Sequence, residues 1–315
     1  MISASEIGGL MAMIPTFTTP DGGELHVRDT INVAGIHDGV AKILRDGATA
    51  IATTGSFGEP INLLDHEFEL HVNEVVKAVD KRVPVIVGVI TTNTRKALEY
   101  VKVAKDAGAD AVMCSVPYYY EQTIENVVQY YKDIAETFPD LGMFMYHNPI
   151  IHKTRIPVSA FHEIVKLPNF VGMKDSHRSP EEFDELMSII RGKISTFVLP
   201  HQYVEYAEKG AAGVWAIDAW NGPEPFVKLV ALVKAGRMEE ARQLAHDVFF
   251  VENDYCDDLR WRETGHKVVQ RYCGYIDPGP LRRPYVHIPP EVDALFRRRA
   301  TYWKALREKV ASIEV

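Results

Sequence analysis

Residues 170–176, Phe-Val-Gly-Met-Lys-Asp-Ser, could carry covalent chemistry because an apolar run, typical of a buried strand, ends on Lys174. Within this run, Gly172 leaves room for another group to approach the backbone closely. Burial at a strand end disfavours the charged amine and lowers its pKa. A neutral lysine can then attack a carbonyl carbon and form a Schiff base. The structural alternative is a lysine whose stem packs while its ammonium group reaches water.

Polar and aromatic side chains also follow other apolar runs of the chain. The turn Gly55-Ser-Phe-Gly-Glu59 could bind a carboxylate through its backbone N–H groups and the Ser56 hydroxyl, although glycines often only shape a turn. Tyr146 could transfer protons, or it could only complete a buried hydrogen bond. The candidate site residues from these runs are Gly55, Ser56, Phe57, Tyr118, Tyr119, Tyr120, Tyr146, Trp220 and Asn221.

Short apolar runs alternate with amphipathic stretches through the first 235 residues or so, which predicts eight strand–helix units. We expect strands over 9–17, 48–54, 83–89, 111–116, 142–146, 170–174, 196–199 and 213–217. Asp65 is a plausible N-cap for a helix over 65–79, and Ser179-Pro180 opens another helix. Such repetition indicates a parallel sheet, and eight units at this length favour a closed (β/α)8 TIM barrel. In that fold the carboxyl ends of the strands share one face, so the candidate residues should converge there.

The remaining chain, 237–315, predicts about three helices, over 238–254, 257–272 and 291–309, with a proline-rich crossing over 277–285. No low-complexity segment or linker separates it from the barrel. We therefore expect a barrel over 1–236 and a C-terminal helical extension of the same domain over 237–315.

Composition excludes several classes of protein. The chain has 315 residues, 46% of them hydrophobic and 25% charged, as expected of a globular protein with a large core. Its net charge of -8 argues against a nucleic-acid partner. Cys114, Cys256 and Cys273 lack the spacing of a disulfide framework or zinc site, and the histidines form no metal motif, so we expect no metal. The start lacks signal-peptide features and no apolar run reaches membrane-spanning length, so we expect a cytoplasmic protein with no membrane association.

Taken together, Gly55-Ser-Phe-Gly-Glu59, Tyr146 and Gly172-Met-Lys174 resemble motifs of the dihydrodipicolinate synthase / N-acetylneuraminate lyase family, over nearly the whole chain and in order. The resemblance implies a (β/α)8 barrel with a C-terminal helical extension and pyruvate-based Schiff-base chemistry that needs no cofactor. It also implies that Lys174 forms the Schiff base, that Tyr146 shuttles protons, and that Ser56 and Phe57 hold the pyruvate carboxylate. Tyr119 matches a tyrosine that reaches a neighbouring subunit's site in family tetramers, so a homotetramer is expected.

Departures from the family pattern indicate a subgroup. The synthase has an arginine a few residues beyond the tyrosine that matches Tyr146, and near that position this chain has Ile151. Phe57 replaces a hydroxyl residue of the carboxylate motif, as in the similar hydratase-aldolases that cleave arylidene-pyruvates. Arg271 and Asp277 depart from that subgroup, and Arg271 or Arg282 is a candidate to meet an acidic ring substituent.

These features predict a hydratase-aldolase that converts a hydroxy- or carboxy-benzylidenepyruvate and water into an aromatic aldehyde and pyruvate. Phe57 and Trp220 could flank the aromatic ring. The alternatives are an aldolase or dehydratase acting on 2-keto-3-deoxy sugar acids, a dihydrodipicolinate synthase, or a non-catalytic barrel that binds a pyruvate-like ligand. Retention of both Lys174 and Tyr146 argues against the non-catalytic barrel.

Overall fold

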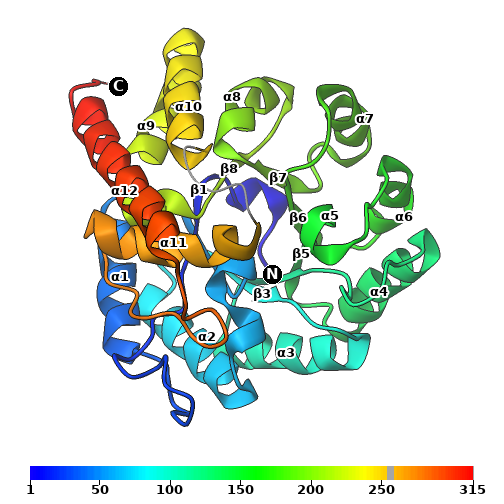
Figure 1. Cartoon of the computed structure of the whole chain (residues 1–315). Coiled ribbons are helices and arrows are strands. Elements are labelled where there is room, and N and C mark those ends of the chain that lie inside the picture. The colour runs from blue at the N-terminus through cyan, green and yellow to red at the C-terminus, as the bar shows by residue number, and fades with distance from the viewer. Residues whose placement is uncertain (254–258, 315) are drawn as a thin grey trace.

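Eight parallel strands close into a barrel in sequence order, which confirms the expected fold class (Figure 1). The computed structural model describes residues 1–253 and 259–314. The strands are β1 (Gly9–Met13), β2 (Ala50–Thr53), β3 (Val85–Val89), β4 (Ala111–Cys114), β5 (Gly142–His147), β6 (Phe170–Asp175), β7 (Ser195–Val198) and β8 (Gly213–Ala216). β1 pairs with both β2 and β8, so the sheet has no free edge.

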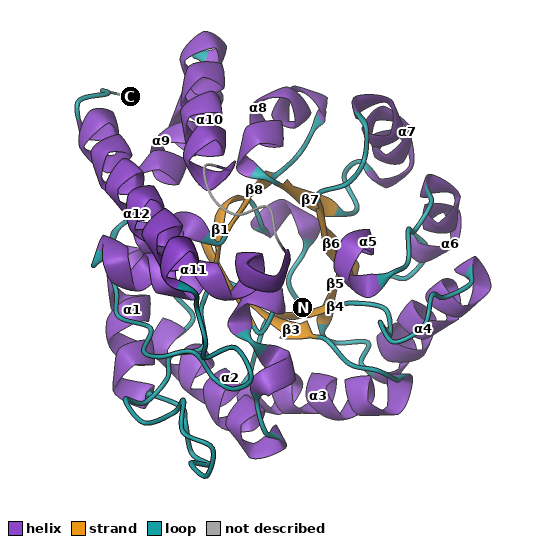
Figure 2. Cartoon of the chain, in the orientation of Figure 1, coloured by secondary structure: helices purple, strands orange, loops and turns teal. Residues whose placement is uncertain are grey.

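Helices follow the strands and form an outer ring (Figure 2). They are α1 (Val33–Arg45), α2 (Asp65–Val79), α3 (Thr94–Ala107), α4 (Ile124–Thr137), α5 (Pro149–His152), α6 (Phe161–Ile164), α7 (Pro180–Ile190), α8 (Pro200–Lys209), α9 (Glu224–Lys234), α10 (Met238–Asn253), α11 (Leu259–Cys273) and α12 (Pro290–Ala311). Short 3-10 turns include η2 (Ser56–Gly58) and η5 (Asp218–Asn221). The expected N-cap at Asp65 was wrong: Leu64 has the extended N-cap backbone, and the Glu67 carboxylate accepts a hydrogen bond from its N–H.

Side chains alternate between two cores because successive strand residues point to opposite faces. Met11 and Met13 of β1 point into the barrel, whereas Leu10 and Ala12 pack outward against the helices. The interior cluster also contains Phe144, Tyr146 and Trp215. The alternation therefore brings inward side chains from opposite walls of the barrel together, and those at the carboxyl ends of the strands lie at its mouth.

An irregularity between β5 and β6 sets which side chains enter the barrel. Met143 pairs with Phe170 and Phe144 pairs with Gly172, so Val171 is an extra residue of β6. A Cβ atom on Gly172 would lie 2.2 Å from Cε1 of Phe144, so glycine is required there. The close approach expected at Gly172 is thus made by an aromatic ring.

The C-terminal helices pack on the barrel, and α11 lies across its carboxyl end against η2 and η5 (Figure 1). A buried cluster of charged residues joins α11 to this end of the barrel. Glu59, directly after η2, accepts hydrogen bonds from Lys267 Nζ of α11 at 2.7 Å and from an Arg282 guanidinium nitrogen at 2.9 Å. Residues more than 200 positions apart in sequence therefore meet at the mouth of the barrel.

Cys114 and Cys273 are buried free thiols, and Cys256 lies outside the described residues. Over 1–253 and 259–314, no helix is both long enough and apolar enough to cross a membrane.

Candidate active site

Lys174 and Tyr146 lie side by side at the carboxyl end of the barrel. They are partners in the register of β5 and β6, two residues beyond the Phe144–Gly172 pair, so both side chains enter the interior. Lys174 Nζ lies 5.2 Å from the centroid of the Tyr146 ring. Lys174 is 4% exposed and Tyr146 is 1% exposed. The Lys174 amine therefore stays inside the barrel, and the structure does not show the alternative in which its ammonium group reaches water.

Ser56 joins this pair to the turn after β2. Its Oγ atom lies 3.2 Å from the Tyr146 hydroxyl. Two non-glycine residues with left-handed backbones, Thr54 at φ 49° and Glu59 at φ 53°, flank the turn. Such conformations are strained and persist only where surrounding contacts impose them. Here Thr54 donates a hydrogen bond to Gly88 O and Glu59 is held by its two cations, so the turn is fixed from both ends.

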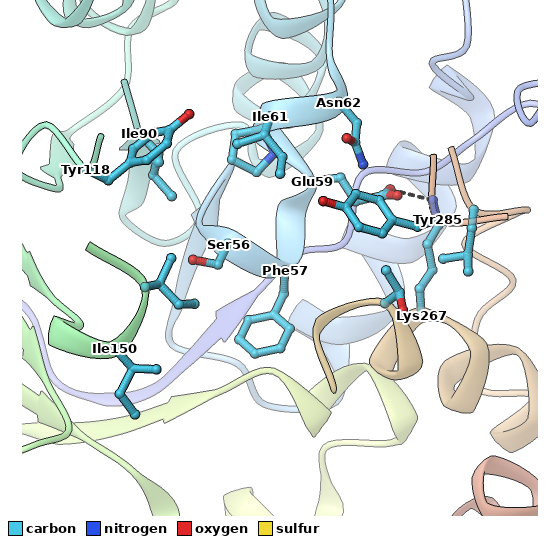
Figure 3. Close-up of a pocket in the computed structure, with 14 residues that line it drawn as sticks. Ser56, Phe57, Glu59, Ile61, Asn62, Ile90, Tyr118, Ile150, Lys267 and Tyr285 are labelled. Atoms are coloured by element: carbon cyan, nitrogen blue, oxygen red, sulfur yellow. Dashed lines mark hydrogen bonds and ion pairs between the residues drawn. The ribbon is translucent and has the colours of Figure 1, made fainter. Parts of the chain in front are cut away.

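A cavity of about 520 Å³ opens beside Ser56. Figure 3 shows Ser56 and Phe57 at its centre, Ile90, Tyr118 and Ile150 on one side, and Glu59, Asn62, Lys267 and Tyr285 on the other. Ile61, Ile151 and Leu281 add further apolar surface. Lys174 and Tyr146 are not part of this lining, but Ser56, which is, has its hydroxyl 3.2 Å from that of Tyr146. A ligand with its polar head beside Ser56 and an apolar tail against the apolar side chains of the cavity would fit this arrangement.

A buried ionic cluster supports the end of β6 from behind. The Asp175 carboxylate accepts hydrogen bonds from His147 Nδ1 at 3.0 Å and from Arg178 Nε at 2.6 Å. Burial alone would raise the pKa of Asp175, but the hydrogen bond from His147 and the charges of His147 and Arg178 outweigh it and hold that pKa below its ordinary value. The strand therefore ends in a rigid ionised group directly after Lys174.

Two residues between Asp175 and Arg178, Ser176 and His177, were not among the candidate site residues predicted from the sequence. Lys174 Nζ donates a hydrogen bond to Ser176 Oγ at 2.8 Å, and Ser176 Oγ lies 2.7 Å from His177 Nδ1. Burial, and next the charge of Lys174, lower the pKa of His177 to about 4, so its ring is neutral at pH 7. Their position in sequence, immediately after the candidate lysine, was the signal that could have found them.

Two further rings border Tyr146. The Trp215 ring centroid lies 5.9 Å from that of Tyr146 inside the barrel, and the His152 ring meets Tyr146 edge-on at 4.9 Å. Burial, and next the charge of Lys174, lower the pKa of His152 to about 3. The alternation of side chains along β8 places Trp215 on the same face as Gly213. The sequence alone does not indicate whether that face points into the barrel or toward the helices.

The expectation that Trp220 and Asn221 line the mouth was wrong. Both are fully buried in η5. Trp220 packs edge-on against Phe17 in the outer core, with ring centroids 6.2 Å apart, because η5 turns the chain away from the barrel axis. The Asn221 amide donates to Asp218 at 2.8 Å. Trp215, five residues earlier, is the tryptophan that lies beside the candidate site.

Arg271 and Arg282 do not reach the cavity as free cations. Arg271 pairs with Asp277 at 3.3 Å in a separate surface hollow. Arg282 is buried and donates to Glu59, Thr30, Thr16 and Phe17. The suggestion that either arginine meets an acidic ring substituent was therefore wrong.

Tyr119 lies outside the cavity of its own chain. It is 63% exposed, its ring packs edge-on against that of Tyr120 at 4.8 Å, and Lys153 Nζ lies 6.0 Å from it. In the described part of the chain, no group of three or more histidine, cysteine or acidic residues is arranged to hold a metal ion.

Comparison with known proteins gives relatives over nearly the full length. A model of the dihydrodipicolinate synthetase family matches residues 17–298. The trans-O-hydroxybenzylidenepyruvate hydratase-aldolase of Pseudomonas aeruginosa is 24% identical, with 99% of this chain and 96% of the relative aligned. The trans-2'-carboxybenzalpyruvate hydratase-aldolase of Nocardioides sp. (strain KP7) is also 24% identical, with 98% of this chain and 96% of the relative aligned. The solved structure described as PhdJ bound to substrate intermediate superposes with a TM-score of 0.92 at 23% identity. The superposition covers 98% of this chain and 99% of that chain, which shows the same fold.

Proposed function

The chain belongs to the dihydrodipicolinate synthetase family of pyruvate-dependent, Schiff-base-forming lyases, and from that premise we propose that it is a hydratase-aldolase acting on an arylidene-pyruvate. The observation that carries the proposal is the largely apolar cavity lined by Ser56, whose hydroxyl also contacts Tyr146 of the buried Lys174–Tyr146 pair. Full-length relatives named as hydratase-aldolases support the same reaction.

In the proposed mechanism the 2-oxo acid enters with its carboxylate toward Ser56 and the backbone N–H groups of Ser56 and Phe57. The Lys174 amine attacks the keto carbon, and loss of water leaves a protonated imine. This imine withdraws electrons from the conjugated double bond. Tyr146, left as a tyrosinate after giving its proton to the departing water, takes a proton from a second water molecule as the oxygen of that molecule adds to the carbon bearing the ring. It then returns this proton to the neighbouring carbon of the resulting enamine, so that the protonated imine forms again and Tyr146 can accept another proton.

Cleavage reverses the flow of electrons. Tyr146 takes the proton of the new hydroxyl group, the carbon–carbon bond breaks, and the aromatic aldehyde leaves. The imine on Lys174 accepts the electron pair as an enamine. Protonation of the enamine carbon and hydrolysis of the imine release pyruvate and restore the amine.

The cavity wall favours an aromatic tail over a sugar acid. Phe57 and Ile151 present apolar surface where a polyhydroxylated chain would need hydrogen-bond partners. An offset aromatic contact is worth about 0.5–1.5 kcal/mol beyond area burial, or roughly a 2- to 13-fold preference for an aryl group. Lys267, a cation of this wall, donates to Thr16 O, Thr18 Oγ1 and Glu59, which accounts for its three N–H donors. An uncharged ring is therefore favoured over a carboxylated one.

The test compares initial rates of aldehyde release from benzylidenepyruvate and its hydroxy and carboxy derivatives with rates on 2-keto-3-deoxy sugar acids. Trapping with pyruvate and borohydride, followed by mass spectrometry, identifies the nucleophile, with Lys174→Ala as the variant that should gain no label. We expect aldehyde from the uncharged aryl substrates and label on Lys174. Faster turnover of the sugar acids, with no aldehyde from any aryl substrate, would overturn the aromatic assignment, and label on another lysine would overturn the role of Lys174.

A further inference from the structure

We propose that Ser176 and His177 form a proton path between the Lys174 amine and solvent, and this inference rests on Lys174 being the nucleophile proposed above. The path consists of two consecutive hydrogen bonds, 2.8 Å from Lys174 Nζ to Ser176 Oγ and 2.7 Å from Ser176 Oγ to His177 Nδ1. Both lengths are within the normal range for strong hydrogen bonds.

The chemistry requires such a path because an ammonium group cannot attack a carbonyl. Lys174 must lose one proton before each imine forms, and it is 4% exposed. Ser176 and His177 are only partly buried, so the chain of hydrogen bonds runs from the closed interior outward. Tyr146, in contrast, is 1% exposed and turned toward Ser56, where it serves the proposed substrate protons.

The direction of transfer follows from the donors and acceptors. A proton moves from Lys174 Nζ to Ser176 Oγ while the serine hydroxyl proton moves to His177 Nδ1, and the imidazolium then releases its Nε2 proton to water. The imidazole must be neutral at Nδ1 to accept, and the low pKa of His177 keeps it so at pH 7. When Lys174 loses its charge, one cause of that low pKa disappears, so the imidazolium forms more readily as transfer proceeds.

The surrounding groups hold His177 in place. Its backbone N–H donates to Asp175 Oδ1 at 3.2 Å, and Arg155 donates to its carbonyl oxygen at 3.1 Å. The His147 ring lies edge-on to it, with centroids 6.4 Å apart. Of these neighbours, Asp175 favours the imidazolium, whereas His147 and Arg155 disfavour it.

The experiment measures the rate of imine formation by mixing enzyme with pyruvate and quenching with borohydride at successive times. Ser176→Ala should slow imine formation by about 10-fold or more, somewhat below the usual 10² or more for a general acid–base group, because water can partly replace the hydroxyl. The final amount of label on Lys174 should stay that of the wild type. Ser176→Thr keeps the hydroxyl and should remain near the wild-type rate, as should the matched control Ser188→Ala on the exposed face of α7.

His177→Ala provides a second readout that a structural role would not produce. Its slow imine formation should be restored by added imidazole, with the restored rate rising with the fraction of neutral imidazole across pH. Equal rates and pH profiles for Ser176→Ala and Ser188→Ala, or no rescue of His177→Ala, would overturn the path. Absence of label on Lys174 in the wild-type enzyme would instead overturn the proposed nucleophile itself.

Discussion

At the scale of single residues, the pairing of Lys174 with Tyr146 depends on a glycine two positions earlier. Phe144 occupies the space that a side chain at Gly172 would need, and the next inward pair is Tyr146 and Lys174. The amine thereby lies beside the Tyr146 ring, whose hydroxyl lies 3.2 Å from Ser56 Oγ.

Tyr146→Phe tests the proton-transfer role while keeping the ring beside Lys174. It removes the hydroxyl that lies 3.2 Å from Ser56 Oγ. We expect turnover of an arylidene-pyruvate to fall about 10²-fold or more, the usual scale for losing a general acid–base group, while some imine formation remains. The control is Tyr100→Phe on α3, whose hydroxyl bonds to Asp65 outside the barrel. Near wild-type turnover of Tyr146→Phe at saturating substrate would remove Tyr146 from the proton relay.

At the scale of elements, the turn after β2 is held from the far end of the chain. Glu59 joins that turn to α11 through Lys267 and to the C-terminal crossing through Arg282. Burial lowers the pKa of Lys267 to about 8, although the nearby Glu59 carboxylate opposes that change. The position of Ser56 and Phe57 therefore depends on α11, although this helix contributes neither Lys174 nor Tyr146.

Glu59→Gln should destabilise the protein, because it leaves two buried cations without their shared carboxylate. Breaking a buried pair typically costs about 3–5 kcal/mol. The free energy of unfolding is measured in urea, with Glu240→Gln, part of an exposed pair with Arg237, as the control that should unfold like the wild type. Equal midpoints for the two variants would mean that the cluster does not hold the turn.

At the scale of the whole molecule, buried neutral histidines make stability depend on pH. Burial, and next the charges of Arg282 and Lys267, lower the pKa of His71 to about 3. In the unfolded chain His71 binds a proton near pH 6.5. Between these values the unfolded state binds more protons than the folded state, so stability falls as pH falls, and this change is complete below about pH 3.

The prediction is that acidification from pH 7 to pH 5 costs about 2 kcal/mol of unfolding free energy through His71 alone, since 1.5 pH units below the unfolded pKa correspond to about that amount. His71→Gln should lose less stability over this interval than the wild type by that amount. Chemical denaturation at the two pH values measures it. Identical losses for both proteins would show that His71 is protonated equally in the folded and unfolded states.

Assembly is the second property at this scale. Tyr119 and Tyr120 are 63% and 73% exposed, as large aromatic groups that contact a second chain would be when one chain is described alone. With the family resemblance at Tyr119, this leads us to expect a homotetramer in light scattering at micromolar concentration. A mass of one chain across that range would contradict the expectation.

The sequence by itself determined the properties that are local or repetitive. Eight apolar runs, each followed by an amphipathic stretch, specify strand–helix units that bury both faces of a parallel sheet, so the barrel was predictable. Lys174 lies near the end of such a run and Ser56 shortly after another, and their placement at the carboxyl end of the barrel follows from chain direction.

Only the tertiary structure decided which strand residues enter the barrel and which distant groups meet. Trp215 and Trp220 are both tryptophans near the end of one run, yet only Trp215 borders Tyr146, because η5 carries Trp220 outward. The extra residue at Val171 and the contact of Glu59 with Lys267 and Arg282 likewise have no local signal. The physical reason is that barrel closure sets the strand register and long-range charge pairing, whereas sequence periodicity reports only which residues share a face.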